Sequence, residues 1–214
     1  MKIFDCFLYN GEFDMLNLRL HELYDVVDWF VITESTYTHK GDKKELVYPK
    51  QSLQLKKFKD KIVYIPNYTL HSATSPYTNE IEQRRYLSKG IENANNNDVI
   101  LLSDVDEIPD VNVLKQIKNS NFKGQYVFLQ HFYYYNTKCR HKELWRGPVV
   151  VDVETFISLD EDMQKLRDNR LVLPDITLRG HVTGWHFSYF GNVEEIRKKL
   201  NSFHHQEYNT EKYT

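Results

Sequence analysis

The chain has 214 residues, of which 28 are basic and 30 acidic, so its formal net charge at pH 7 is −2. This balance excludes the strongly basic surface that binding to nucleic acid or to an anionic membrane requires. The length suffices for one α/β domain with a sizeable core. The 15 Tyr, 12 Phe and 3 Trp offer apolar faces that suit either that core or sugar rings.

The first half of the chain alternates apolar runs with segments of helical spacing. Short apolar runs predict strands, and apolar residues spaced three or four apart from Phe13 to Leu23 predict the first helix. Polar, irregular stretches predict loops at 36–50 and 66–77. The predicted strands are residues 3–8, 29–32, 62–65 and 99–102, and the further helices are 51–58 and 78–95.

The second half is less regular, and residues 157–183 show no clear element. The pattern predicts a helix over 111–117, strands at 125–135 and within 147–156, and a last helix that Asn192 caps. This order of elements predicts a single α/β domain with right-handed crossovers, in which helices flank a mixed, mostly parallel central sheet.

Two features bear on the compartment. Apolar runs are too short for a signal sequence or a membrane span, so we expect a cytoplasmic protein, with a luminal domain cut from its anchor as the alternative. Cys6 and Cys139 are expected to be free thiols.

Val99 to Pro109 is the most informative segment. Four apolar residues predict a buried strand, and Asp104, Asp106 and Glu107 follow it directly. In an open α/β sheet, ligands bind at the carboxyl ends of strands. Carboxylates there need a positive partner, and Mg²⁺ or Mn²⁺ suits their hard oxygens.

The bare Asp-x-Asp pattern is weak, because a chain of this length contains about one by chance. A second copy, Asp160 to Asp162, has no apolar strand before it, and we interpret it as a solvated loop or a helix start. For the first copy, the simpler alternative is an Asp-rich turn that caps the following helix.

Arg84 lies on the same face of its predicted helix as Ile81, Leu87 and Ile91. An arginine in an apolar stripe needs a partner if it is buried, and this helix leads into the motif strand. Arg84 is therefore a candidate for a diphosphate or for a motif carboxylate. The alternative is a side chain that reaches solvent at the edge of the helix.

Further polar groups follow other strands. His186, within Gly184 to Tyr189, is a candidate metal ligand or a structural histidine. Tyr9 and Glu34 end the first two strands, where they would face a nucleotide's base and ribose, or else serve turns and caps. His204 and His205 form another polar cluster at the end of the last helix.

The chain resembles glycosyltransferase family 17, which includes the bisecting β-1,4-N-acetylglucosaminyltransferases. The likeness is carried by blocks in the family's order and approximate spacing over nearly the whole chain. These blocks are 10–16, 19–23, 25–35, 37–38, 98–109, 184–189 and 199–207.

This resemblance implies a GT-A fold, that is, a Rossmann-like sheet with a metal-binding Asp-x-Asp and a nucleotide-sugar donor. It implies residues 1–110 as the nucleotide-sugar-binding half and 111–214 as the acceptor-side half of one domain, 1–214. The donor would be a UDP-sugar, with GlcNAc favoured, transferred with inversion to a glycan or glycoprotein acceptor.

Specific residues are implied as well. Asp104 and Asp106 would bind Mn²⁺ or Mg²⁺ and the diphosphate, with His186 as a third metal ligand. Glu207 and Asp175 are the candidate catalytic bases, and Tyr133, Tyr134 and Trp145 are candidates to stack on acceptor sugars.

The chain lacks an anchor and ends soon after the last helix, which suggests a bacterial or viral member of the family or one domain of a longer protein. Three alternatives stay open. The donor could be UDP-glucose or a deoxysugar nucleotide. Outside this class, the motif also occurs in haloacid-dehalogenase-like phosphohydrolases, and the tyrosines suit a non-catalytic carbohydrate-binding module.

Overall fold

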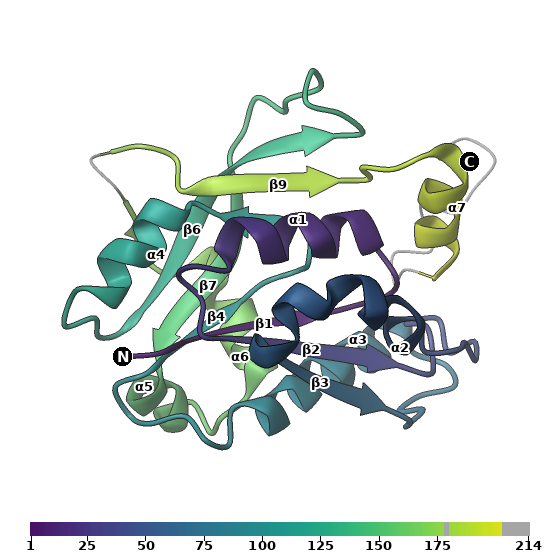
Figure 1. The fold of residues 1–214 in the computed structure, drawn as a ribbon, viewed down its shortest axis with the longest axis horizontal. Coiled ribbons are helices and arrows are strands. Elements are labelled where there is room, and N and C mark those ends of the chain that lie inside the picture. The colour runs from purple at the N-terminus through teal and green to yellow at the C-terminus, as the bar shows by residue number, and fades with distance from the viewer. Residues whose placement is uncertain (178–179, 203–214) are drawn as a thin grey trace.

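A nine-stranded sheet crosses the molecule in the order β3-β2-β1-β4-β7-β6-β9-β5, with β8 beside β6. The computed structural model describes residues 1–177 and 180–202 (Figure 1). The strands are Ile3–Leu8 (β1), Trp29–Ser35 (β2), Ile62–Asn67 (β3), Val99–Leu102 (β4), Glu107–Pro109 (β5), Gln125–Tyr134 (β6), Trp145–Asp152 (β7), Asp175–Ile176 (β8) and Gly184–Ser188 (β9).

Helices cover the sheet. The α-helices are Phe13–Leu23 (α1), Tyr48–Gln51 (α2), Pro76–Arg85 (α3), Val111–Lys118 (α4), Val153–Ser158 (α5), Met163–Asp168 (α6) and Val193–Ser202 (α7). The 3-10 helices are Ser52–Lys61 (η1), Tyr86–Gly90 (η2) and Asn169–Leu171 (η3).

The predicted mixed, mostly parallel sheet is confirmed. Strands β3, β2, β1 and β4 pair in parallel, whereas β7 pairs antiparallel with both β4 and β6. The carboxyl ends of the parallel strands therefore meet at one edge of the sheet. In Figure 1 the arrowheads of β2, β3 and β9 point toward the side on which α7 lies.

Two apolar layers sandwich the sheet, which explains why its strands are continuously apolar. One layer joins α1, η1 and α4 to one face, with Phe7, Leu20 and Phe58 fully or almost fully buried. The other joins η2, α5 and α6 to the opposite face, around Leu87 and Phe156. The core thus fixes β1 and β4 from both sides.

The helix predicted over 78–95 is shorter than expected. It consists of α3, which ends at Arg85, and the 3-10 helix η2, which ends at Gly90. A Cβ on Gly90 would lie 2.2 Å from Val31 Cγ1, so the chain passes too close to β2 for a side chain there. This close approach to the sheet coincides with the end of the helix.

Several smaller predictions are confirmed. Asp162 caps α6 by accepting from the Gln164 amide at 2.8 Å, so the second Asp-x-Asp is a helix start. Asn192 caps α7 through the Glu194 amide. Cys6 and Cys139 are free. Among the described residues, no helix has both the length and the apolar character needed to cross a membrane.

Candidate active site

The Asp-x-Asp loop connects β4 to β5, and a fully buried arginine of α1 holds it in place. Arg19 donates hydrogen bonds to the carbonyl oxygens of Asp104 at 3.0 Å and Glu107 at 2.9 Å, and to the Ser103 hydroxyl at 2.6 Å. Its charge is balanced by Asp5 of β1, 2.5 Å away, and neither side chain is exposed. The loop is therefore anchored to both β1 and α1.

Glu107 holds the turn of this loop. Its carboxylate is fully buried and accepts from the Asp104 amide at 3.0 Å. It also accepts from the Trp145 indole at 2.6 Å and from Arg167 of α6 at 2.7 and 2.8 Å. All four hydrogen bonds come from the protein, so this carboxylate is a structural anchor.

Asp104 lies between two arginines. Its carboxylate is 2.9 Å from Arg167 and 3.5 Å from Arg84, and its side chain is 43% exposed. Burial raises the pKa of Asp104, but the charges of Arg167 and Arg84 outweigh it and lower the pKa to about 2. Asp104 is therefore ionised and already paired.

Arg84 is buried rather than at the solvent edge of its helix. Glu80 lies 2.5 Å from its guanidinium, and Gln164 of α6 accepts a hydrogen bond at 2.6 Å. Its guanidinium also lies 3.5 Å from the carboxylate of Asp104, which is one of the two partners proposed for it.

Asp106 is the more enclosed aspartate, with 8% of its side chain exposed. Its Oδ2 accepts a hydrogen bond from Lys199 of α7 at 2.8 Å, and its Oδ1 lies 3.6 Å from Nε2 of His186. Burial opposes ionisation, but Lys199 and His186 lower the pKa of Asp106. The His186 ring stacks on Phe132 with centroids 4.6 Å apart, and its Nδ1 is buried with no hydrogen-bond partner among residues 1–177 and 180–202.

These side chains surround a polar cavity of about 340 Å³ at the carboxyl ends of β1 and β4. We call it the polar cavity. Most of the predicted site residues line it together, although they come from four parts of the chain. They are Tyr9, Arg84, Asp104, Asp106 and His186.

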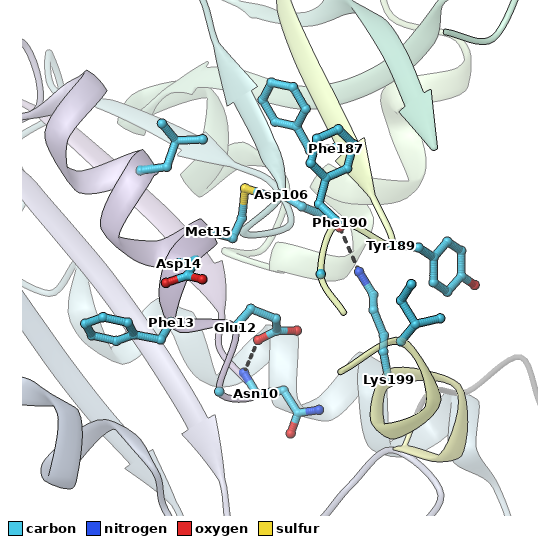
Figure 2. Close-up of a pocket in the computed structure, with 14 residues that line it drawn as sticks. Asn10, Glu12, Phe13, Asp14, Met15, Asp106, Phe187, Tyr189, Phe190 and Lys199 are labelled. Carbon is cyan, nitrogen blue, oxygen red and sulfur yellow. Dashed lines mark hydrogen bonds and ion pairs between the residues drawn. The ribbon is translucent and has the colours of Figure 1, made fainter. Parts of the chain in front are cut away.

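A second cavity, of about 450 Å³, lies between α1, the end of β9 and α7 (Figure 2). We call it the apolar cavity, because Phe13, Met15, Phe187 and Phe190 line it. In Figure 2, Lys199 extends from α7 toward Asp106 at its edge. Five residues line both cavities, namely Asn10, Glu12, Asp106, Tyr189 and Lys199.

The other predicted site residues are placed elsewhere. Glu34 is fully buried, and its carboxylate accepts from the amides of Val47 at 2.7 Å and Tyr48 at 3.0 Å, so the structure uses it to hold the chain after β2. Asp175 forms an ion pair with Arg146 and lines neither cavity.

Glu207, His204 and His205 lie outside the described residues. The three aromatic candidates differ: Tyr134 and Trp145 line the polar cavity, whereas Tyr133 stacks on Phe187.

Three site residues were missed, namely Arg19, Arg167 and Lys199. Arg19 carries the same signal as Arg84, a charged residue beside the apolar positions of a helix, Leu16, Leu20 and Leu23. Arg167 falls in the segment with no clear periodicity, and Lys199 belongs to a recognised block without a predicted role. Of these three residues, only Arg19 lies in a sequence pattern from which its role could have been predicted.

The side chains present fit a divalent cation for which water and substrate supply most of the ligands. No group of three or more His, Cys, Asp or Glu side chains within 1–177 and 180–202 is arranged to hold a metal. Asp106 and His186 offer one carboxylate and one imidazole. Mg²⁺ commonly binds through one or two carboxylates and substrate phosphates, and Mn²⁺ accepts the same oxygen ligands.

Two mammalian enzymes of the same name resemble the chain in sequence. Rat β-1,4-mannosyl-glycoprotein 4-β-N-acetylglucosaminyltransferase is 23% identical over 89% of this chain and 40% of its own length. The human protein of the same name is also 23% identical, over 89% of this chain and 41% of its length. The chain thus spans about two fifths of the length of these relatives.

Solved structures resemble the chain more distantly. A putative glucose-1-phosphate thymidylyltransferase from Bacillus anthracis superposes with a TM-score of 0.48 at 13% identity, over 86% of this chain and 88% of its own. The glycosyltransferase GlyE of Streptococcus pneumoniae gives 0.38 at 12% identity, over 80% of this chain and 39% of its own. The sequence model of glycosyltransferase family 17 matches residues 1–213, and the chain therefore belongs to this family.

Proposed function

We propose that this chain transfers a sugar from a UDP-sugar to a hydroxyl of a glycan or glycoprotein, with inversion and with the help of a divalent cation. One observation carries the proposal: in a family 17 chain, Asp104 and Asp106 share a cavity with Arg84 and Lys199 at the carboxyl ends of β1 and β4. This is the edge at which α/β sheets bind nucleotides.

The polar cavity holds cations that suit a diphosphate, beside the carboxylates of Glu12, Glu80, Asp104 and Asp106. Arg84 lines this cavity from α3 and Lys199 lines it from α7. Both side chains can bind phosphate oxygens. Tyr9 at the end of β1 lines the same cavity, although its side chain is largely buried. These groups would hold the donor with its diphosphate beside Asp106.

A cation bound by Asp106 and His186 would supply Lewis-acid stabilisation to the departing diphosphate. Within the protein, Arg19 and Glu107 keep the loop rigid, so Asp106 needs little reorganisation when the leaving group gains charge. For the base that takes the acceptor proton, Glu207 remains our candidate. Asp175 is a weaker one, because Arg146 binds it.

The mammalian relatives support the choice of donor and acceptor. Their names describe transfer of N-acetylglucosamine to a mannosyl glycoprotein. We therefore propose UDP-GlcNAc as the first donor to test, and a mannose-containing glycan as the first acceptor.

A thermal-shift screen tests the donor. UDP-GlcNAc, UDP-glucose, GDP-mannose and dTDP-glucose are each added with and without Mn²⁺, since a ligand that binds only the folded state raises its melting temperature. We expect a UDP-sugar to give the largest shift, and only with Mn²⁺. A carbohydrate-binding module would respond to glycans and to no nucleotide.

Asp106→Asn tests the site, and Asp160→Asn is its matched control. Both aspartates belong to an Asp-x-Asp, but the side chain of Asp160 is 81% exposed on the far copy. We expect Asp106→Asn to lose Mn²⁺-dependent transfer and Asp160→Asn to keep it. Equal activity of the two variants would contradict the proposal, as would an aspartyl-phosphate trapped on Asp104.

A further inference from the structure

Lys199 binds the carboxylate on which the proposed cation would sit. Its Nζ is 2.8 Å from Asp106 Oδ2, and His186 approaches the other oxygen at 3.6 Å. The Lys199 side chain is 26% exposed and lines both cavities. The ammonium group therefore neutralises the carboxylate that the proposed cation needs.

A divalent ion and the ammonium group cannot share this carboxylate without strong repulsion. Two positive groups on one enclosed carboxylate repel at a few ångströms, and the low polarity of a buried site strengthens that repulsion. Binding of a cation to Asp106 would therefore weaken the hold of this carboxylate on Lys199. The polar cavity, which Lys199 already lines, is the nearest space for it.

Two of the cations that line the cavity, Arg84 and Lys199, are held differently. Arg84 is fixed by Glu80 at 2.5 Å and by Gln164 at 2.6 Å, and it is buried. Lys199 has a flexible four-carbon stem that reaches from α7 at the rim of the cavity, with its Nζ 5.5 Å from the Tyr189 ring centroid. Of these two, Lys199 is the one whose side chain can reach a second partner in the cavity.

We propose that Lys199 exchanges between Asp106 in the cation-free protein and the diphosphate of the nucleotide donor when a divalent cation binds Asp106. This inference rests on the proposed function, which supplies the cation and the donor. It assigns Lys199 two opposite effects: it competes with the cation and it helps to bind the nucleotide.

Because the two effects of Lys199 on ligand binding are opposite, they can be tested directly on the full chain. Calorimetry measures Mn²⁺ binding without nucleotide, and then UDP binding in saturating Mn²⁺. For Lys199→Met we expect Mn²⁺ to bind about 10-fold more tightly, because its competitor is gone, and UDP about 10-fold more weakly, because a charge-assisted hydrogen bond is lost. Lys199→Arg keeps the charge and should change both constants less.

Arg197→Met is the matched control, since Arg197 is an exposed cation on the same helix. It should leave both constants near those of the original protein. If Lys199→Met weakens both ligands, or changes neither, the exchange is wrong while the proposed function stands. If neither the original protein nor Lys199→Met binds Mn²⁺, the cation in the proposed function is wrong and the exchange falls with it.

Discussion

Arg167 and Glu107 form a buried ion pair although 60 positions separate them in the chain. Two hydrogen bonds, of 2.8 and 2.7 Å, join the guanidinium to the carboxylate. The same guanidinium binds Asp104 at 2.9 Å and the carbonyl of Gly147 at 2.9 Å. Helix α6 therefore fixes the Asp-x-Asp loop from one face of the sheet, while Arg19 of α1 fixes it from the other.

Replacing Arg167 should be severely destabilising. Arg167→Met leaves the Glu107 carboxylate buried without its cation, and breaking such pairs costs about 3–5 kcal/mol. We expect the free energy of unfolding, measured in urea, to fall by about this amount. Arg85→Met is the control, because the Arg85 side chain is 45% exposed in its ion pair with Asp162. It should cost less than about 1 kcal/mol, and equal losses would contradict the anchoring role.

Replacing Arg19 should reduce ligand binding as well as the free energy of unfolding. Arg19→Met leaves Asp5 buried and unpaired, so unfolding should become easier by about 3 kcal/mol or more. Adding Asp5→Leu removes that charge and should restore part of the loss. It cannot restore the bonds to the carbonyls of Asp104 and Glu107. The double variant should therefore regain stability but still bind UDP and Mn²⁺ weakly; full recovery of binding would show that Arg19 does not position the loop.

The sequence could predict the parts of the site that follow one strand or one helix. Asp104 and Asp106 follow an apolar run, and a strand end in an α/β sheet has a known relation to ligands. Arg84 was recognisable because a charge interrupts an apolar stripe. In both cases the signal lies within about ten residues, where periodicity determines which way a side chain points.

The remaining contacts depend on the tertiary fold. Arg167 and Lys199 reach the motif across 60 and 93 positions, and neither lies in a local pattern that indicates a carboxylate partner. Glu34 shows the converse: its place at a strand end suggested a ligand, but nearby amides take its carboxylate. Local spacing does not reveal which backbone amides will need a side-chain carboxylate as their hydrogen-bond partner.

Gly184 should not tolerate a side chain. A Cβ there would lie 2.4 Å from the carbonyl oxygen of Ile108, where β5 pairs with β9 close to His186. Overpacking of this kind costs about 1–3 kcal/mol, and we expect Gly184→Ala to lose that much in urea unfolding and to weaken Mn²⁺ binding. Gly180→Ala is the control, because nothing lies within 4 Å of its Cβ although φ is +76°. It should leave Mn²⁺ binding unchanged.

Protonation of Asp104 at low pH should lower the free energy of unfolding. Because the arginines lower its pKa from 3.8 to about 2, the folded state holds this proton less tightly than the unfolded state. The resulting stability is fully present above pH 4 and is lost as the pH falls toward 2. The side chain is 43% exposed, so solvent screening reduces the contribution to about 1 kcal/mol. Between pH 5 and pH 2, the free energy of unfolding measured in urea should fall less for Asp104→Asn than for Asp160→Asn. Equal falls for the two variants would contradict the pairing of Asp104 with the arginines.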